Sequence, residues 1–493
     1  MGRRRVLVRV LTPIAVLLAT SLLTAGTALA TVAPHPLETA LFHSATDGAT
    51  LARIRGTGVS YVRINMEWRA VAPAQPSASF DPTNPADPQY QWVVYDRLVS
   101  AALSHGLQPF VTIFAAPDWA QRGPPATPYA NSYMPDPNSF AQFALAVARR
   151  YSGTFDGLPR VRYYQAWNEP NISLYLVPQL VGGQPVSPGV YREMLNGFAD
   201  AVHSVNAGNV VVAAGLAPFR DITAEVQAQD SDWGPLSFMR ALLCLGPNLK
   251  PTCNAPVKFD VWAQHPYTSG GPLHHAVLPN DVSLGDLPKV RRVLAAAESV
   301  GHIVSASGAP KLWVTEFSWD SNPPDPAGVP IKVETRWVSE ALYRMWLNDV
   351  DLVTWLQLAD SPMATSYYQS GLYYYGATLA ESRPKPILEA FRFPFVAYRS
   401  GKSAAVWGRT PWGRQSGVVV EQRVRRRWLR LTMLRTDRYG VFQTRVALRS
   451  AGLVRARLAT TGETSVPFSL TLVPDHFYNP FGLPTLLEPP KPK

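Results

Sequence analysis

Short apolar runs alternate with amphipathic segments from Leu41 to Tyr398. The runs are rich in β-branched and aromatic residues, which favour strands. The segments between them carry apolar residues at intervals of three and four, which is typical of helices. Strands are therefore predicted at 41–43, 61–65, 108–114, 161–167, 210–215, 259–264, 312–316 and 353–358. The clearest helical patterns lie at 140–151, 191–205, 287–300 and 335–347.

Eight strands that alternate with helices predict an α/β fold in which a parallel sheet closes into a (β/α)₈ TIM barrel. The loops after several strands are long and rich in proline and aromatic residues; they lie at 73–90, 117–137, 171–188, 218–235 and 320–330. Long loops inside a compact domain are usually functional. Because all of them follow strands, they are expected to form one rim and one cleft at the carboxyl face of the barrel.

The pattern changes after Tyr398 to short β runs at 403–407, 417–421, 428–434, 440–445, 453–458 and 468–472. A spacing of about ten residues, with turn signals such as Gly440 and Gly452, predicts a small antiparallel β-sandwich. We therefore assign the barrel domain to 31–400 and the sandwich to 401–473. The proline-rich segment 474–493 is expected to be an extended strap or a free tail.

Residues 1–30 have the features of a secretory signal peptide. Three arginines, Arg3 to Arg5, precede an apolar stretch from Val10 to Leu23, and Ala28-Leu29-Ala30 supplies the small residues of a cleavage site. Cleavage predicts a secreted or cell-surface protein without stable membrane insertion. The alternative is an uncleaved anchor, because the charge-free stretch 10–33 is long enough to span a bilayer.

The formal net charge of +11 is unevenly distributed. Residues 31–400 carry 26 Lys and Arg against 30 Asp and Glu, whereas residues 401–458 carry 14 against two. The basic character therefore belongs to the C-terminal module. The two cysteines, Cys244 and Cys253, are expected to form a disulfide in an exported protein, with two isolated thiols as the alternative.

Two strand ends carry the clearest candidates for catalysis. In VRYYQAWNEPN a β-favouring run leads to Glu169, and Pro170 ends the strand because it has no N–H to donate. In KLWVTEFSWD, Leu312, Val314 and Glu316 are expected to share one strand face, with Glu316 at the carboxyl end. Two carboxylates at the catalytic face of a parallel barrel are what glycoside hydrolysis requires.

Three motifs together resemble the clan of retaining glycoside hydrolases built on TIM barrels: WNEP after the fourth strand, QHPY after the sixth and TEF at the seventh. The cellulase-like family five is one similar family. The β-xylosidase and iduronidase-like family thirty-nine is another, and the full WNEPN is more similar to it. The resemblance covers about residues 41–398 and implies an enzyme that acts on an oligo- or polysaccharide without a cofactor or metal.

The resemblance makes Glu169 the general acid/base and Glu316 the nucleophile. That chemistry needs carboxyl groups about 5–5.5 Å apart, with Glu169 protonated and Glu316 ionised. Asn168 is implied to bind the 2-hydroxyl of the sugar. Neighbours on a regular strand point to opposite faces, so Asn168 and Glu169 can share a pocket only if the strand ends or bulges there.

The resemblance also implies roles for four further residues. Tyr267 would donate a hydrogen bond to the nucleophile. Arg63 would lie beside the nucleophile, with an internal salt bridge within the site as the alternative. His265 would contact substrate, with a satisfied core histidine as the alternative. Trp355 would stack on the sugar at the cleavage point.

Trp119 in APDWA and Trp319 in FSWD are candidates to extend this stacking surface, with core packing as the alternative. Two features depart from the families. The third strand ends in Phe114-Ala115-Ala116-Pro117 without a polar residue, and the cysteine-bearing segment 220–256 is a long insertion after the fifth strand. The remaining sugar subsites are therefore left open.

Other chemistries fit less well, because no glycine-rich phosphate loop follows a strand and no HExxH or paired CxxC is present. Two alternatives use the same barrel: a non-catalytic cell-surface glycan-binding protein, and a transglycosylase with the same two glutamates. The basic run RRRWLR at 425–430 favours an acidic cell-surface polymer over nucleic acid as a partner. Its alternative is a solvated strand edge, where charges discourage aggregation.

Overall fold

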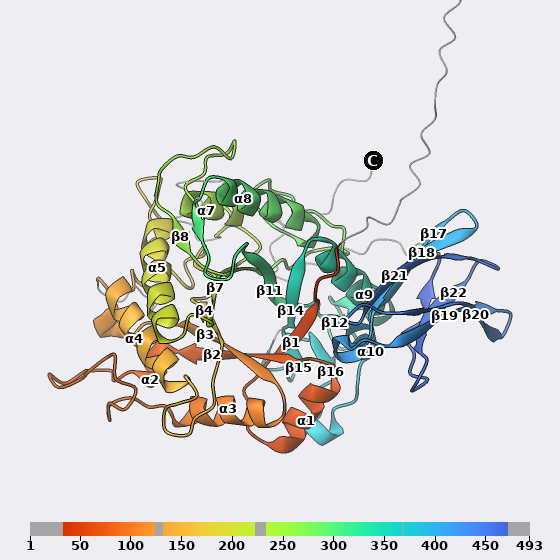
Figure 1. Cartoon of the computed structure of the whole chain (residues 1–493), viewed down its shortest axis with the longest axis horizontal. Coiled ribbons are helices and arrows are strands. Elements are labelled where there is room, and N and C mark those ends of the chain that lie inside the picture. The colour runs from red at the N-terminus through yellow and green to blue at the C-terminus, as the bar shows by residue number, and fades with distance from the viewer. Residues whose placement is uncertain (1–32, 124–131, 222–232, 367, 472–493) are drawn as a thin grey trace, which may run out of the picture. The chain divides into compact units, whose positions relative to one another are not determined.

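The computed structural model describes residues 33–123, 132–221, 233–366 and 368–471; the predicted signal peptide and the 474–493 tail lie outside them. Eight parallel strands form a closed barrel in the order β1-β14-β11-β9-β7-β4-β3-β2 (Figure 1). Their bounds are β1 Glu38–Phe42, β2 Tyr61–Glu67, β3 Gln108–Phe114, β4 Tyr163–Ala166, β7 Val210–Leu216, β9 Val261–Gln264, β11 Lys311–Phe317 and β14 Val350–Trp355. The predicted eight-stranded parallel barrel is confirmed.

Helices surround this barrel (Figure 1). They are α1 Gly48–Gly56, α2 Trp68–Val71, α3 Val93–Ser104, α4 Pro137–Arg150, α5 Ser187–Val205, α7 Pro235–Leu242, α8 Leu287–Ser299, α9 Ile331–Leu347 and α10 Pro386–Arg392. Helix α4 illustrates how they form: Asp136 caps it by accepting from the Ser139 N–H at 2.8 Å, and Phe140, Phe143 and Val147 are buried on one face. In the described part of the chain, no helix combines the length and the apolar character that crossing a membrane requires.

Short two-stranded sheets lie in the segments between the barrel strands and helices. They are β5 Leu180–Val181 with β6 Gln184–Pro185, β8 Val257–Lys258 with β10 Ile303–Val304, β12 Ser321–Asn322 with β13 Val329–Pro330, and β15 Gln357–Ala359 with β16 Gly371–Tyr373.

The interior of the barrel is divided into an apolar and a polar layer. The apolar layer consists of Ala40, Phe110, Val210, Val212, Val261, Ala263, Trp313 and Leu352, with Tyr61 and Tyr163 packed against it. Side chains alternate along a strand, so the residue two positions further on also faces inward. On four strands that residue is polar and buried: Arg63, Thr112, Gln165 and Thr315. The barrel is therefore filled at one end and polar at the carboxyl end, where the long loops begin.

The C-terminal strands form two antiparallel sheets. One contains β17 Phe395–Ser400, β18 Ser403–Arg409 and β21 Val441–Ala447. The other has the order β20-β19-β22-β23, with β19 Gly417–Val424, β20 Arg427–Arg435, β22 Leu453–Leu458 and β23 Phe468–Ser469. All six predicted strands are present, and β17 is an additional strand in residues that the sequence analysis placed with the barrel. The arrangement of the two sheets as a sandwich stays a prediction.

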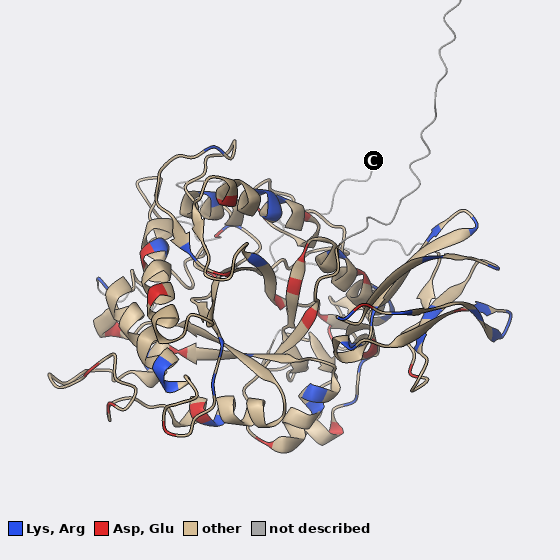
Figure 2. Ribbon diagram, viewed as in Figure 1, with Lys and Arg blue, Asp and Glu red and all other residues tan. Residues whose placement is uncertain are grey.

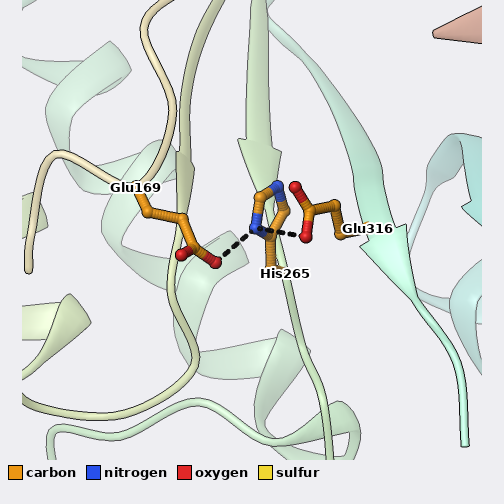
Figure 3. Close-up of side chains that lie close together, drawn as sticks. All are labelled: Glu169, His265 and Glu316. Carbon is orange, nitrogen blue, oxygen red and sulfur yellow. Dashed lines mark hydrogen bonds and ion pairs between the residues drawn. The ribbon is translucent and has the colours of Figure 1, made fainter. Parts of the chain in front are cut away.

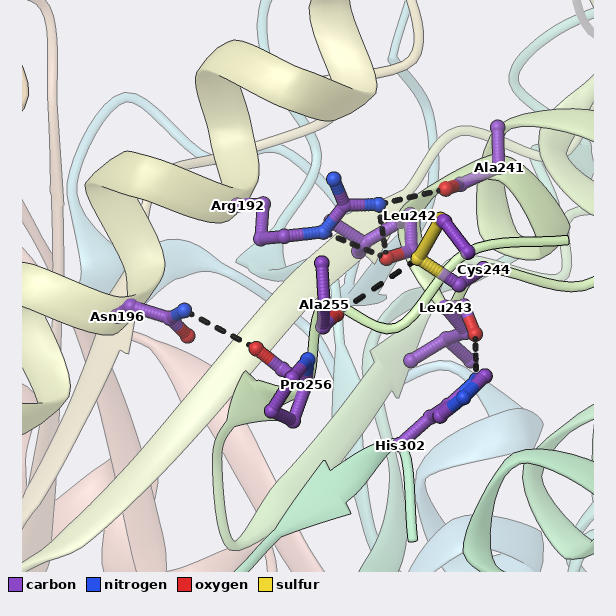
Figure 4. Close-up of a disulfide and its surroundings, with 10 residues drawn as sticks. Arg192, Asn196, Ala241, Leu242, Leu243, Cys244, Ala255, Pro256 and His302 are labelled. Carbon is purple, nitrogen blue, oxygen red and sulfur yellow. Dashed lines mark hydrogen bonds between the residues drawn. A yellow bond between two sulfur atoms is a disulfide. The ribbon is translucent and has the colours of Figure 1, made fainter. Parts of the chain in front are cut away.

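The inserted segment after β7 is tied to the barrel's outer layer. Cys244 and Cys253 form a disulfide, with their Cα atoms 5.1 Å apart. Beside it, Arg192 of α5 donates to the carbonyls of Ala241 and Leu242, and Asn196 donates to that of Pro256 at 3.1 Å (Figure 4). The disulfide and these hydrogen bonds together hold residues 241–256 of the insertion against α5, and residues 222–232 of the insertion lie outside the described part of the chain.

Candidate active site

Glu169 reaches the carboxyl face of the barrel because β4 stops before it. The strand ends at Ala166, and Trp167 and Glu169 have φ values of +69° and +41°. Left-handed backbone at non-glycine residues costs on the order of 1–3 kcal/mol and is found mostly at functional sites. The alternation of the strand is thereby broken, so Asn168 and Glu169 both contact site residues, Arg63 and His265.

Glu316 reaches the same face through a bulge. Val314 pairs with Val353 and Phe317 with Trp355, so three steps along β11 match two along β14. Leu312 and Val314 lie in the core outside the barrel lumen, as alternation predicts. The extra residue turns Glu316 away from them. The expectation that Glu316 shares a face with Leu312 and Val314 is therefore wrong, and a local irregularity is what brings its carboxylate to the barrel mouth.

The two glutamates flank His265 (Figure 3). Its Nδ1 lies 2.7 Å from Glu169 Oε1 and 3.7 Å from Glu316 Oε2. One carboxyl oxygen of each glutamate and one ring nitrogen of His265 lie within 4.8 Å of one another. The side chains of Glu169 and Glu316 are 14% and 16% exposed, whereas His265 is fully buried. Both carboxyl groups are thus partly accessible to a ligand, whereas the imidazole between them is not exposed to solvent.

Arg63 joins the nucleophile candidate to Asn168. Its Nη1 donates to Glu316 Oε1 at 2.9 Å, and its Nη2 donates to Asn168 Oδ1 at 2.7 Å. Its Nε lies 3.0 Å from both Asn65 Oδ1 and Thr112 Oγ1. Arg63 is fully buried, and burying a charge is tolerable only when it is paired and hydrogen-bonded. The guanidinium therefore fixes the positions of Glu316 and Asn168 together.

Burial shifts the pKa values of Glu169 and His265, the two neighbours of Glu316, in opposite directions. It raises the pKa of Glu169 to about 8, against the opposing charge of Arg63, and lowers the pKa of His265 to about 4. At neutral pH, Glu169 therefore holds a proton and His265 is neutral. Burial also raises the pKa of Tyr267 far above its ordinary value, so its hydroxyl stays a donor, 3.3 Å from Glu316 Oε2.

Two tyrosines near the site were not anticipated from the sequence. The charges of both glutamates contribute to raising the pKa of Tyr175 and of Tyr368, after burial as the main cause. Tyr175 also accepts a hydrogen bond at its carbonyl from Trp167 Nε1 at 2.7 Å. Both tyrosines lie on loops, after β4 and after β15, where no period or motif marks a residue as part of the site.

Gly215 was likewise not singled out, although it fits tightly behind His265. Its φ is +66°, and a Cβ on it would lie 2.7 Å from Gln165 Nε2 and 2.9 Å from His265 Nε2. Its carbonyl accepts from the Glu169 N–H at 3.1 Å. Glycine is therefore required here both for the backbone conformation and for space.

The predicted stacking tryptophans lie in different environments. Trp355 and Trp319 are 2% and 1% exposed, and their indole N–H groups donate to the carbonyls of Ser370 and Gly270. Both rings pack against Phe317, which fits the core alternative. Trp119 is half-buried and donates to the Pro73 carbonyl at 2.8 Å. Stacking on a sugar stays a prediction for all three.

Glu169, His265 and Glu316 are also the described residues whose spacing could suit a metal ion. The guanidinium of Arg63 already contributes a positive charge at 2.9 Å from Glu316. A metal cation would be repelled by it, and like charges at such distances are costly where solvent is largely excluded. The arrangement therefore suits carboxylate chemistry better than metal binding.

No protein-family model matches the sequence, and no curated protein matches it. Among solved structures, the chain is similar to a family 39 glycoside hydrolase from Bacteroides cellulosilyticus WH2, at 15% identity and a TM-score of 0.48 over 84% of this chain and 81% of the other. It is similar to a glucosidase from Croceicoccus marinus, at 16% identity and a TM-score of 0.48 over 84% and 93%. A GH30 endoxylanase from Clostridium papyrosolvens C71 is similar at 12% identity and a TM-score of 0.41 over 84% and 94%. These likenesses are too remote to carry function, which is inferred below from the geometry of the site.

Proposed function

We propose that this protein is a secreted retaining glycoside hydrolase that cleaves an oligo- or polysaccharide, with Glu169 as the general acid/base and Glu316 as the nucleophile. The observation that carries the proposal is the approach of the two carboxyl groups, whose nearer oxygens lie within 4.8 Å of each other. Retaining enzymes place these groups about 5–5.5 Å apart, whereas inverting enzymes need about 6.5–9.5 Å to admit a water molecule. The spacing therefore favours direct attack by Glu316.

In the first step a Glu316 oxygen forms a bond to the anomeric carbon while the bond to the glycosidic oxygen breaks. Glu169 gives its proton to that oxygen, and the aglycone leaves as an alcohol. In the second step Glu169, now a carboxylate, takes a proton from water as the water oxygen attacks the anomeric carbon. The ester bond to Glu316 breaks, which releases the sugar and restores both glutamates.

The surroundings of the pair supply what each step needs. Glu169 is protonated at neutral pH because its pKa is about 8. Glu316 is held by Arg63 and by the Tyr267 hydroxyl, so its attacking oxygen is oriented before substrate binds. Asn168 accepts from Arg63 at Oδ1, which leaves its amide N–H to donate to a sugar hydroxyl in this proposal.

The test is hydrolysis of a panel of aryl glycosides with the anomer of the first product followed by NMR. Retention of configuration is expected, and Glu316→Gln should lower kcat by about 10⁴-fold or more. Glu169→Gln should spare substrates with a dinitrophenyl leaving group, which needs no proton, more than those with a methyl group.

An inverted first product, or full activity in Glu316→Gln, would overturn the proposal. Transfer of the sugar to an added acceptor instead of water would identify a transglycosylase. Binding of glycans without turnover in the native protein would identify a glycan-binding barrel.

A further inference from the structure

One face of the β20-β19-β22-β23 sheet is buried and the other carries a concentration of arginine. Val418, Val420 and Gln422 of β19 point to the buried face, with Val454 and Ala456 of β22 beside them. The register places the intervening residues on the opposite face, because directly paired residues point the same way. We call this opposite face the cationic face and define it by Arg423, Trp428, Arg430, Arg435, Arg455 and Arg457.

The cationic face has little acidic compensation. Glu421 is the one acidic residue in the described strands β19, β20 and β22, and it is ion-paired with Arg455 and Arg457 at 2.9 Å each. The remaining three arginines, Arg423, Arg430 and Arg435, are exposed. Figure 2 shows the blue of Lys and Arg along these strands with little red. The face is therefore a positively charged surface open to solvent.

An aromatic ring lies within this charge. Arg455 stacks on Trp428, with its guanidinium carbon 4.1 Å from the ring centroid. Neighbouring strands are roughly 5 Å apart and alternate residues along a strand about 7 Å apart, so the charges recur at intervals on the order of the length of one sugar residue. Guanidinium groups bind carboxylate and sulfate in bidentate fashion.

We propose that the cationic face binds an anionic polysaccharide, one that carries carboxylate or sulfate groups along its length. Charge complementarity selects a polyanion. The choice of a polysaccharide among polyanions rests on the proposed function, since the same chain then carries a carbohydrate site at the barrel mouth. A membrane surface is less well matched, because among the described residues of this sheet Met433 is the one large apolar side chain that is exposed.

The experiment measures binding of the full-length protein to polygalacturonate by titration calorimetry, at low and at high salt. The face variant replaces Arg423, Arg430 and Arg435 by Gln. A matched control, Arg97→Gln/Arg292→Gln/Lys332→Gln, removes the same charge from exposed positions on α3, α8 and α9. A Lys triple at the face positions keeps the charge and checks that the face variant has not lost binding through misfolding.

We expect the face variant to bind polygalacturonate about tenfold more weakly and the control to bind like the native protein. Binding should weaken at high salt, should be retained by the Lys triple, and should be absent with an uncharged galactan. Because the face lies outside the catalytic pair, Glu316→Gln should bind normally even though it does not hydrolyse. Loss of polygalacturonate binding and loss of hydrolysis can therefore be observed independently, so a failure of this proposal is distinguishable from a failure of the proposed function.

Three results would overturn the proposal: no binding to polygalacturonate, equal weakening in the face and control variants, or tighter binding to duplex DNA or to phosphatidylglycerol vesicles than to polygalacturonate. The first would leave the arginines as a solvated strand edge that resists aggregation.

Discussion

The proton on Glu169 is the most consequential single-residue property of the site, because the first chemical step uses it. Burial raises the pKa of this carboxyl to about 8. The protonated fraction, and with it the rate, falls as pH rises through that value. We therefore expect kcat/KM to decline above pH about 8, by about tenfold per pH unit.

A pH–rate profile with an unactivated substrate measures this decline. Glu169→Gln supplies the control, because its residual activity on a dinitrophenyl glycoside should lack the alkaline limb. An alkaline limb centred below pH about 6 in the native enzyme would contradict the assignment of Glu169 as the acid.

Gly215 offers a residue-scale test of how tightly the site is built. In Gly215→Ala the new methyl group would lie 2.9 Å from His265 Nε2, and the backbone would keep a φ of +66°. We expect a loss of roughly 1–3 kcal/mol in the free energy of unfolding and a kcat at least tenfold lower, because His265 must move. Thermal denaturation and steady-state kinetics measure the two effects.

The matched control is Gly189→Ala in the first turn of α5, where a Cβ would meet nothing within 4 Å. This change should leave kinetics unaltered and keep or slightly raise stability. Equal behaviour of the two variants would show that the space behind His265 is not limiting.

The positive charge of Arg63 also leads to a prediction about the effect of metal removal on activity. Since its guanidinium occupies the positive position beside Glu316, dialysis against EDTA should leave hydrolysis unchanged, and added Zn²⁺ should not raise it. Loss of activity on dialysis with recovery on adding a divalent ion would instead mean that Glu169, His265 and Glu316 bind a metal.

At the scale of elements, the strands were predictable because their period is local. The β3 bounds match the predicted 108–114, but β4 ends at Ala166, so Pro170 is not what ends the fourth strand. What local pattern does not contain is an irregularity set by a partner strand. The bulge that turns Glu316 depends on how Val314 and Phe317 of β11 pair with Val353 and Trp355 of β14. Similarly, the eighth strand was predicted at 353–358, but the chain leaves the barrel after Trp355, and β15 pairs with β16 instead.

The site was predictable to the extent that its residues sit in barrel strands or directly after them. Glu169, Glu316, His265, Tyr267 and Arg63 were all named from motifs, and the structure brings them together. Tyr368 is absent from that set because it belongs to the loop between β15 and β16, whose path depends on tertiary contacts. One such contact is the Gln369 N–H, which donates to Asp320 Oδ1 at 2.8 Å.

The disulfide allows a prediction about the inserted element. Closing a loop of nine residues' separation is expected to stabilise the fold by roughly 2–3 kcal/mol, so Cys244→Ser/Cys253→Ser should lower Tm by several degrees. Differential scanning calorimetry measures the shift. Dithiothreitol should lower the Tm of the native protein toward that of the variant and leave the variant unchanged. An identical Tm for both proteins would mean that the hydrogen bonds from Arg192 and Asn196 suffice to hold the insertion.

At the scale of the whole molecule, the barrel and the C-terminal sheets belong to one compact unit. Trp407 of β18 packs on Tyr343 and Trp346 of α9, with ring centroids 5.2 and 5.7 Å apart. Arg336 of α9 lies over Phe468 of β23 at 4.1 Å. Helix α9 is thus shared, because one side of it supports the barrel and another meets the sheets. Such sharing predicts that the two parts unfold together.

Trp407→Ala tests this coupling. The ring is fully buried and its Nε1 has no hydrogen-bond partner within the described structure, so the variant loses packing without breaking a polar contact. The cavity left by the indole is expected to lower the free energy of unfolding by about 3–5 kcal/mol. If α9 couples the two parts, calorimetry should show one transition that moves as a whole to lower temperature, and hydrolytic activity should disappear at that same temperature. Trp428→Ala, in which the half-buried ring lies on the cationic face, should shift the transition much less.

Two separate transitions, of which Trp407→Ala moves just one while activity keeps its native midpoint, would mean that the sheets fold independently of the barrel. In that case α9 would not transmit stability between the two parts.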